Sequence, residues 1–398
     1  MKYHITTYGC QMNHSDSEKI AAILKGSGHR PARDESEADL IVVNSCSVRQ
    51  AAMHRVYDKI EKFYRGKKVI IAGCVLPADK EKYQSKVEFW HPDDYFDRIP
   101  LAASQFRAYI PIMTGCDNFC SYCAVPYTRG REKSRPAAEI IKEIRSLVKK
   151  GYKEIILLGQ NVNSYKSPEN GTKFYSLLKQ INTIPGDFWL NFISSHPKDM
   201  SDELIQTIAQ CEKITPYIHL PVQSGDNLIL RKMNRHYTVA HYKALIKKLR
   251  AAFKKSRPAF PPLAVSTDII VGFPTETKKQ FQNTARLARN IGFDMIYFAQ
   301  YSPRPGTAAA TMPDDVPQAE KKKRAQKLNE ILKQTAQKNN RKYIGQKIEV
   351  LIEEINDKFA IGKTSTFKTV RLAAKKLKPG DIVTIKVTKA TAWGLTGG

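Results

Sequence analysis

Acidic residues are scarce in this chain of 398 residues, which carries 38 Asp and Glu against 65 Lys and Arg and has a formal net charge of +27. An excess of this size favours a polyanionic partner, above all nucleic acid, over a merely solvated surface. Hydrophobic residues still make up 42% of the chain, which is enough to form buried cores in two or three domains.

Long hydrophobic runs are also missing, because no segment approaches the roughly 18 apolar residues that cross a bilayer. The first residues, Met1–Ile5, are typical of a strand and not of a signal peptide. We therefore expect a cytoplasmic protein with no membrane partner. In that reducing compartment, the seven cysteines are expected to be ligands or buried thiols and not disulfides.

Three of the cysteines, Cys116, Cys120 and Cys123, have the spacing C-x3-C-x2-C, and no fourth cysteine or histidine lies close to them. Three thiolates can hold three irons of a four-iron cubane, which leaves the fourth iron open to bind a small molecule. The alternative is a zinc knuckle completed by a distant residue. Zinc sites usually show two C-x2-C pairs, however, and this run contains only Cys120 with Cys123.

Residues 1–100 alternate between strand and helix patterns and predict a small parallel α/β domain. Expected strands are Tyr3–Tyr8, Asp39–Asn44 and Lys68–Ala72, and expected helices are Ser17–Gly26 and Ala51–Tyr64.

One cysteine follows each of these strands, namely Cys10, Cys46 and Cys74. Because the carboxyl ends of parallel strands share one sheet edge, the three thiols are expected to converge and hold a second cluster. The small residue before each cysteine (Gly9, Ser45 or Gly73) is expected to let the backbone approach that cofactor closely.

From residue 107 to about 335, a longer alternation predicts a partial (β/α)6 barrel. The expected strands are Tyr109–Met113, Glu154–Leu158, Phe188–Ile193, Tyr217–Leu220, Val265–Val271 and Asp294–Phe298. Barrel enzymes carry out their chemistry at the carboxyl ends of the strands, and the cysteine run directly follows the first one.

The last part of the chain, 340–398, predicts a small antiparallel β-barrel after a basic helix over 319–342. Such barrels commonly bind oligonucleotides. Aromatic side chains that stack on bases alternate here with cations that neutralise phosphates, although at least one of the aromatics is expected to belong to the barrel's own core. The RNA-binding candidates are Lys358, Phe359, Lys363, Phe367, Arg371 and Trp393.

The cysteine run is similar to the signature of the radical S-adenosylmethionine (SAM) superfamily, and the chain as a whole resembles the radical SAM methylthiotransferases. The stretches that carry the resemblance are Tyr8–Asn13, Cys123–Gly130, Leu158–Tyr165, Ser194–Pro197 and His219–Gly225. Within the family they look most like the branch acting on isopentenylated adenosine of tRNA. The stretch Pro77–Asp97 departs from the family pattern, and the N-terminal domain is shorter than usual.

The resemblance implies an N-terminal domain, a radical SAM barrel and a C-terminal TRAM domain, with two [4Fe-4S] clusters and SAM as cofactors. Cys116, Cys120 and Cys123 would serve radical formation, and Cys10, Cys46 and Cys74 would serve sulfur transfer to C2 of N6-isopentenyladenosine beside the anticodon. Implied partners are the tRNA anticodon loop, a sulfur donor and a reducing electron donor such as flavodoxin or ferredoxin, with the enzyme itself a monomer. Three alternatives stay open: threonylcarbamoyl-adenosine of tRNA as substrate, a ribosomal protein as substrate, or a non-catalytic zinc-containing RNA-binding protein.

Further candidates lie at strand ends. The resemblance implies SAM contacts for Gly159, Gln160 and Asn161, which otherwise form a turn capped by Asn161. His219 and Gln223 are expected to contact SAM or the target base, with a core role as the alternative for His219.

Near the cysteines, Tyr122 is expected to shield the cluster or touch the adenine of SAM. The segment Ser15–Glu18 fits either a capping box or a substrate site that uses Asn13, Asp16 and Glu18.

After the cysteine run, Arg129, Arg131 and Arg135 either pair with anions or are solvated. In the barrel, Asp268 needs a partner because it lies in an apolar strand.

Overall fold

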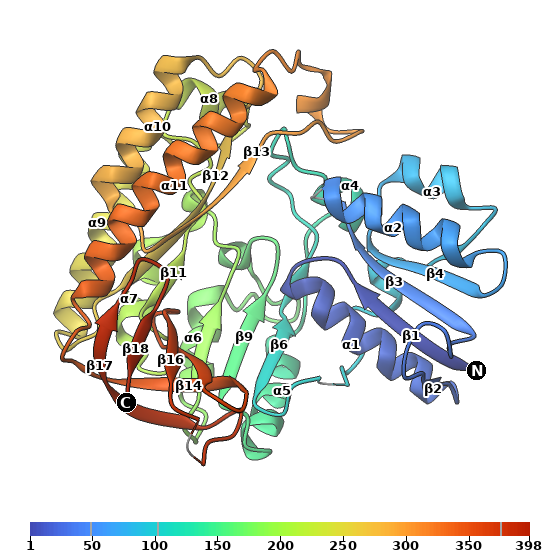
Figure 1. The fold of residues 1–398 in the computed structure, drawn as a ribbon, viewed down its shortest axis with the longest axis horizontal. Coiled ribbons are helices and arrows are strands. Elements are labelled where there is room, and N and C mark those ends of the chain that lie inside the picture. Colours follow the sequence, from blue (N-terminus) through green and yellow to red (C-terminus); the bar gives the residue numbers. More distant parts are fainter. Residues whose placement is uncertain (48–49, 102, 375) are drawn as a thin grey trace.

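The computed structural model describes residues 1–47, 50–101, 103–374 and 376–398, and Figure 1 shows three parts that follow one another along the chain. An N-terminal α/β sheet packs on one side of a half-open barrel, and a small closed β-barrel lies below it. Both of the larger parts are built from parallel strands, whose carboxyl ends are the natural position for a site.

The N-terminal sheet has the strand order β2-β1-β3-β4-β5, and all of its pairs are parallel. Its central strand, β3, is buried at every position because helices cover both faces. On one face pack Ile20 and Leu24 of α1, and on the other pack Val56 and Ile60 of α2. The elements are β1 (Lys2–Thr7), α1 (Gln11–Gly26), β2 (Arg30–Pro31), β3 (Leu40–Cys46), α2 (Gln50–Phe63), β4 (Lys68–Cys74), α3 (Pro77–Tyr83), β5 (Glu88–Phe89) and η1 (Pro92–Asp94).

The three predicted strands of this domain are confirmed to within two residues at each end. Helix α1 begins at Gln11, six residues before the predicted start, so the capping box predicted over Ser15–Glu18 is wrong. The segment Pro77–Asp97, which departs from the family pattern, still supplies a helix and the edge strand β5.

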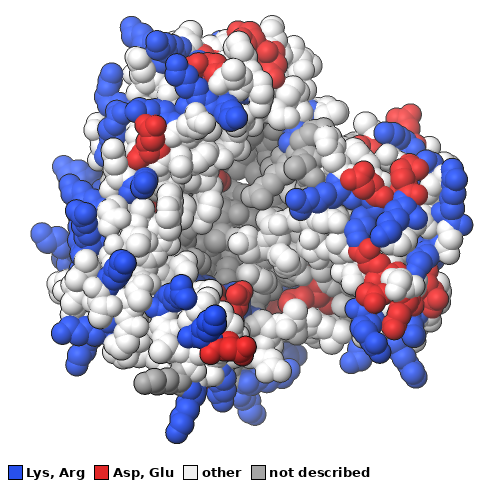
Figure 2. Space-filling view, viewed as in Figure 1, with Lys and Arg blue, Asp and Glu red and all other residues white. Residues whose placement is uncertain are grey.

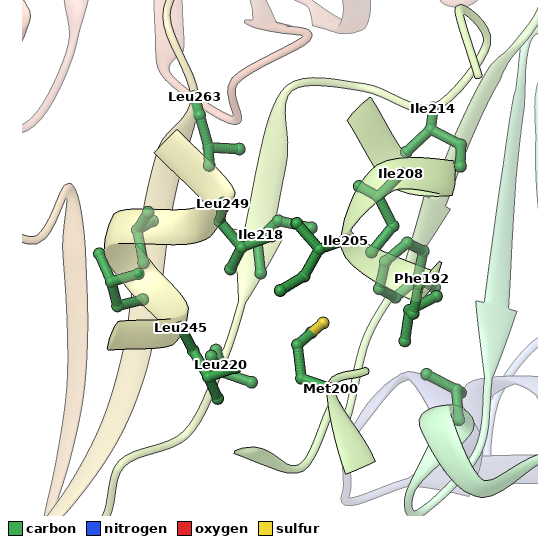
Figure 3. Packing of buried hydrophobic residues seen from close by; sticks show 14 of the residues in the cluster. Phe192, Met200, Ile205, Ile208, Ile214, Ile218, Leu220, Leu245, Leu249 and Leu263 are labelled. Atoms are coloured by element: carbon green, nitrogen blue, oxygen red, sulfur yellow. The ribbon is translucent and has the colours of Figure 1, made fainter. Parts of the chain in front are cut away.

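The barrel is confirmed as a partial (β/α)6 fold made of two sheets, β6-β9-β10 and β11-β12-β13, which a single bridge between Leu190 and Ile214 links. Helices cover its outer surface, and Figure 3 shows how Ile205 of α7 and Leu249 of α9 meet Ile218 of β11 in its core. The strands are β6 (Arg107–Pro111), β7 (Met113–Thr114), β8 (Lys133–Ser134), β9 (Glu154–Leu158), β10 (Trp189–Phe192), β11 (Tyr217–His219), β12 (Ala264–Val271) and β13 (Met295–Gln300).

The helices of the barrel alternate with these strands. They are α4 (Val125–Arg129), α5 (Ala137–Lys149), η2 (Val162–Ser164), α6 (Phe174–Asn182), η3 (Pro197–Asp199), α7 (Asp202–Gln210), α8 (Asn227–Lys232), α9 (Val239–Ser256), α10 (Lys278–Ile291), η4 (Ala308–Thr311) and α11 (Gln318–Arg341). The basic helix α11 is not only a solvated face, because Leu328, Ile331 and Leu332 are buried against α10 and β13.

The C-terminal part is a closed barrel with the strand order β14-β15-β16-β18-β17. Its strands are β14 (Lys347–Ile355), β15 (Ala360–Thr364), β16 (Thr369–Leu372), β17 (Ile382–Ala390) and β18 (Leu395–Gly397). Sequence patterns missed β18, which is only three residues long and closes the barrel by pairing parallel to β16 and antiparallel to β17.

This barrel caps the amino ends of the larger barrel's strands, opposite the ends expected to carry the site. Glu154, at the start of β9, is fully buried and accepts from Arg107 of β6 and, at 2.7 Å, from Lys363 of β15. Lys368 pairs at 2.6 Å with Asp294, which precedes β13. The contact therefore joins the two barrels through buried charges that satisfy one another.

The cap changes the interpretation of two RNA-binding candidates. Lys363 is 8% exposed and its ammonium is engaged by Glu154, while the ring of Phe367 stacks on Tyr217 with ring centroids 4.2 Å apart. Neither side chain is free to meet a phosphate or a base, so both serve the contact between the barrels.

The other candidates lie at or near the surface: Lys358 and Trp393 are exposed, and Arg371 lies over the half-buried Phe359 ring at 3.8 Å from its centroid.

Replacing Glu154 by Ala should lower the free energy of unfolding by about 3–5 kcal/mol, because Lys363 and Arg107 would lose their buried counter-charge. Chemical denaturation followed by circular dichroism measures the loss. The control is Lys327→Ala on α11, whose pair with Glu330 is exposed and is worth no more than about 0.5 kcal/mol. Equal effects of the two substitutions would contradict a structural role for the buried pair.

Candidate functional site

A cavity of about 350 Å³ lies between the N-terminal sheet and the barrel, and all six cysteines of the two predicted sets line it. Sequence analysis placed each set at the carboxyl ends of parallel strands, and here those two sheet edges face the same space. The six are Cys10, Cys46, Cys74, Cys116, Cys120 and Cys123. The seventh, Cys211, is buried in the hydrophobic core of the barrel, where it acts as a small apolar residue.

Strand register brings the first set together. Cys46 and Cys74 are direct partners at the ends of β3 and β4, and Cys10 stands just after β1 at the N-cap of α1. Cys46 and Cys74 are buried, whereas Cys10 is exposed. Since Tyr8 N–H still bonds the Asn44 carbonyl, the loop that carries Cys10 continues the sheet before it turns into the helix.

Asn13 joins the loops that carry Cys10 and Cys46. Its amide donates to Asn44 Oδ1 at 2.8 Å and to the Ser45 carbonyl at 2.9 Å, and its Oδ1 accepts from Cys10 N–H at 3.2 Å. Asn13 is completely buried. We conclude that Asn13 has a structural role. In the sequence, that role was indicated by the position of Asn13 three residues after Cys10.

The glycines beside these cysteines make room for that asparagine network and not for a cofactor, contrary to the sequence-based expectation. A Cβ on Gly9 would lie 2.1 Å from Asn13 Oδ1. A Cβ on Gly73, whose φ is +84°, would lie 2.3 Å from Asn44 Oδ1. Any side chain at either position would break the loops that present Cys10 and Cys74.

The second set lies on the loop between β7 and α4. It turns at Gly115, whose φ is +76° and where a Cβ would lie 2.0 Å from the Arg131 carbonyl oxygen, so only glycine fits. The loop is anchored to the end of α8, because Ser121 N–H donates to the Met233 carbonyl and Asn234 Nδ2 donates to the Phe119 carbonyl. These bonds hold the loop in shape independently of any bound group.

Each set also receives a hydrogen bond from one buried arginine. Arg129 Nε donates to Cys74 Sγ at 3.0 Å, and Arg235 Nη1 donates to Cys120 Sγ at 3.5 Å. The guanidinium of Arg129 also pairs with Asp16 on α1. Asp16 is therefore the partner of an arginine in this structure and not a substrate ligand, and Glu18 is engaged by Ala103 N–H. Arg235 carried no signal in the sequence beyond being charged.

Burial controls the protonation of the thiols. Burial raises the pKa of Cys74, and the nearby Arg129 only partly opposes that effect. Burial, with a contribution from Cys120, raises the pKa of Cys123 to about 12. These thiols are thus protonated at neutral pH unless a cation binds them, as expected of soft ligands that release protons when a metal is bound.

Each set offers three thiols, which is the number of cysteine ligands in a cubane with one open iron. Across residues 1–47, 50–101, 103–374 and 376–398, no three Cys, His, Asp or Glu side chains are grouped to hold one metal ion. A structural zinc needs four ligands around a single ion, whereas a cubane takes one cysteine at each iron and spreads its ligands apart. Amide and guanidinium N–H groups beside the sulfurs, such as Asn118 Nδ2 at 3.4 Å from Cys116 Sγ, suit an anionic cluster.

Most of the predicted strand-end residues line the same cavity. Gly159 and Gln160 do so, and the buried Gln160 Oε1 has no partner among the described residues, so it is ready to accept from a ligand. Tyr122 lines the cavity and packs against a small cluster around Phe273 and Met233. Asn161 does not line it, because its amide instead donates to Asp199 at 2.7 Å.

His219, Gln223 and Asp268 form a polar corner of the cavity. His219 Nδ1 bonds Ser266 Oγ at 2.8 Å and its Nε2 lies 3.4 Å from Asp268 Oδ2, so the carboxylate in the apolar strand has the partner it needs. Gln223 has a positive φ of 66°, which a non-glycine residue adopts only when its surroundings hold it there. Both residues line the cavity.

His196 was missed as an individual site residue, although its segment carried part of the resemblance. It lines the cavity, and its Nδ1 accepts from Lys198 N–H while the buried Nε2 has no partner among the described residues. Burial, together with the cations Arg235 and Lys198, lowers the pKa of His196 from 6.5 to about 2. The ring is therefore neutral, with its Nε2–H available as a donor to a ligand.

Comparison with known proteins agrees with this geometry. The Radical SAM superfamily matches residues 110–288, the Uncharacterized protein family UPF0004 matches 2–91, and the TRAM domain matches 341–398. In fold, the chain is similar to the radical S-adenosylmethionine methyltransferase TsrM from Kitasatospora setae, with a TM-score of 0.55 and 13% identity over 78% of this chain and 75% of that one. The barrel and its cysteine loop thus define a radical SAM protein, the class that uses a [4Fe-4S] cluster and SAM.

Named relatives match this chain over its whole length. A tRNA-2-methylthio-N(6)-dimethylallyladenosine synthase of Clostridium novyi is 39% identical, with 100% of this chain and 96% of that protein covered. The protein of the same name in Dictyoglomus thermophilum is also 39% identical, with 100% and 98% covered. This chain belongs to the family of the tRNA-2-methylthio-N(6)-dimethylallyladenosine synthases, which confirms the resemblance to the methylthiotransferases.

Substituting His196 by Gln should flatten the loss of stability in mild acid. The folded protein keeps His196 neutral because its pKa is about 2, whereas the unfolded chain takes up a proton below about pH 6.5. His196 therefore makes the free energy of unfolding fall by up to about 1.4 kcal/mol per pH unit as the pH decreases from 6.5. Denaturation of both proteins between pH 5.5 and 7.5 measures the difference, and parallel curves would contradict a buried neutral ring.

Proposed function

We propose that this chain is a tRNA methylthiotransferase, which adds a methylthio group to C2 of N6-isopentenyladenosine at position 37, beside the anticodon. The observation that carries the proposal is the single cavity lined by two separate three-cysteine sets. One open cluster suffices to cleave SAM, so a second set facing the same space has a use only if another atom, here sulfur, must reach the same substrate. The names of the relatives agree with that substrate.

Two [4Fe-4S] clusters and SAM would supply electron transfer, radical formation, sulfur and methyl groups in this site. Cys116, Cys120 and Cys123 would hold the first cluster, and Cys10, Cys46 and Cys74 the second. Gly159, Gln160, His219 and Gln223 would orient SAM or the target base through the polar groups described above, and Tyr122 would shield the first cluster.

The chain's own residues would do three things in this reaction. The loop anchored by Ser121 would hold the first set rigid, and the asparagine network around Asn13 would hold the second. The neutral His196 and the acceptor Gln160 would orient a polar heterocycle without adding charge. The packing of α1 against β6 would exclude water between the two sets.

We further propose that residues 1–100, 107–335 and 340–398 act as the sulfur-carrying, radical-forming and RNA-binding domains. Lys and Arg side chains project around the outline of the face in Figure 2, as expected for a tRNA partner at a net charge of +27. Lys358, Phe359, Arg371 and Trp393 are the RNA-facing candidates that the cap leaves accessible.

The remaining partners would be a sulfur donor and a low-potential electron donor such as flavodoxin or ferredoxin. We propose that the enzyme works as a monomer in the cytoplasm. No helix in the part of the chain that the structure describes is both long and apolar enough to span a membrane.

Deleting the gene should remove the 2-methylthio group from tRNA while leaving the isopentenyl group in place. Mass spectrometry of digested tRNA nucleosides measures both modifications in one run. Unchanged tRNA would refute the proposal. Loss of methylthiolation on threonylcarbamoyl-adenosine, or on a ribosomal protein in a parallel peptide digest, would point to one of the other branches of the family.

Variants of the two cysteine sets should separate the two roles. Cys116→Ala is expected to abolish SAM cleavage, whereas Cys46→Ala should retain SAM cleavage and lose methylthio transfer. Deoxyadenosine and the modified nucleoside are quantified from the same anaerobic reaction. Cys211→Ala is the matched control, because that thiol lies in the hydrophobic core away from the cavity.

Anaerobic reconstitution tests the metal content directly. The wild-type chain should bind about eight irons and give a brown protein, and each triple cysteine variant should bind about four. A colourless protein containing zinc would instead support the non-catalytic RNA-binding alternative.

A further inference from the structure

Arg129 connects the two halves of the cavity. It is the last residue of α4, six residues after Cys123, and therefore belongs to the barrel. Its side chain is only 2% exposed and crosses to the N-terminal domain, where Nε donates to Cys74 Sγ at 3.0 Å and Nη2 to Asp16. A barrel residue thus places a full positive charge against a thiol of the other domain.

The third nitrogen of this guanidinium is not engaged. Arg129 Nη1 is buried and has no hydrogen-bond partner within the described residues, although Arg129 lines the cavity. Arg235, which contacts Cys120, is different: its Nε donates to Tyr237, its Nη1 to Cys120 and its Nη2 to the Pro221 carbonyl. Arg129, unlike Arg235, thus has a guanidinium N–H without a partner among the described residues.

An unpaired buried donor on a charged group is costly, typically about 1–3 kcal/mol or more. Such a donor persists where a ligand completes it, and a guanidinium N–H requires an anionic or strongly polar acceptor. Because Cys10 and Cys46 line the same cavity, the acceptors expected beside Nη1 are sulfur atoms of an anionic cluster.

We propose that Arg129 is a positioning residue for the second cluster, with Nε bonded to the Cys74 thiolate and Nη1 bonded to a sulfur atom of the cluster itself. Its positive charge raises the reduction potential of that cluster. The proposal rests on the proposed function only in requiring that Cys10, Cys46 and Cys74 bind a cluster.

The direction of the effect follows from charge. Reduction adds one negative charge to a cluster that is already anionic, and a buried cation within hydrogen-bonding distance stabilises the reduced state more than the oxidised state. Asp16 moderates the effect, because its carboxylate neutralises part of the guanidinium charge. Arg235 would act in the same way on the first cluster, so the potentials of the two centres can be set independently.

The test measures the midpoint potential of the second cluster by redox titration followed with electron paramagnetic resonance. The full chain is used with Cys116, Cys120 and Cys123 replaced by Ala, so that only the second cluster gives a signal. In this background the double variant Arg129→Gln/Asp16→Asn removes both buried charges together and leaves no lone buried carboxylate. Its midpoint potential is expected to be more negative than that of the parent, and Arg129→Lys, which keeps the charge, should give a smaller shift.

The matched control is Arg324→Gln/Glu276→Gln. This buried Arg–carboxylate pair is also nearly inaccessible, at 5% and 0% side-chain exposure, and joins α11 to the loop after β12. Neither of its residues lines the cysteine cavity. The control should be destabilised or repacked to a similar degree but keep the parent midpoint.

A parent-like midpoint in Arg129→Gln/Asp16→Asn, with full iron content, would overturn the inference. If that variant loses its iron, the single variant Arg129→Gln, which also removes the cation, decides, and a parent-like midpoint there also overturns the inference. Only about four irons in the wild-type chain would reject the second cluster and the proposed function together. Eight irons with no modified tRNA would reject the proposed substrate alone, because the potential of the second cluster is still measured.

Discussion

The buried ion pair between Arg129 and Asp16 holds the two domains in the relation on which the site depends. Both side chains are about 2% exposed, so the pair contributes to specificity of docking more than to net stability. Apolar contact accompanies it, because Met12 of α1 packs against Ile156 and Leu158 of β9. With this contact in place, two distinct sheets present their strand ends to one shared cavity.

The opposite end of the larger barrel is organised by buried ion pairs with the C-terminal barrel. There the strands begin, and within the larger barrel Glu154 is met by Arg107 and Asn191, and Asp294 by the Val265 N–H. The C-terminal barrel supplies Lys363 and Lys368 to these two positions. The same lysines that give the tail its basic character therefore hold the tail in place, and only the remaining cations are available to RNA.

Sequence patterns were sufficient for the fold and for the cysteines, because both depend on local rules. Apolar runs located the barrel strands, and a cysteine after each N-terminal strand located the first set, since parallel register alone brings Cys46 opposite Cys74. Sequence patterns were not sufficient where the role of a side chain depends on which distant segment of the chain packs against it. The sequence predicted Lys363 as an RNA-binding residue, but its ammonium pairs with Glu154. Arg235 had no local sequence signal, because the cysteine that it contacts, Cys120, lies 115 residues away.

Gly9 and Gly73 show that sequence patterns also do not identify which group occupies the space beside a glycine. Gly9 and Gly73 were correctly recognised as positions where space is short, but the group that needs the space is an asparagine side chain and not a cofactor. Asn13 therefore positions Cys10 and Cys46 through hydrogen bonds to the backbone of their loops. Because buried amides must satisfy all their polar groups, such a network tolerates little variation. A rigid set of thiols facing a second rigid set is what the proposed reaction with two open clusters would require, since neither centre could move far to meet the base.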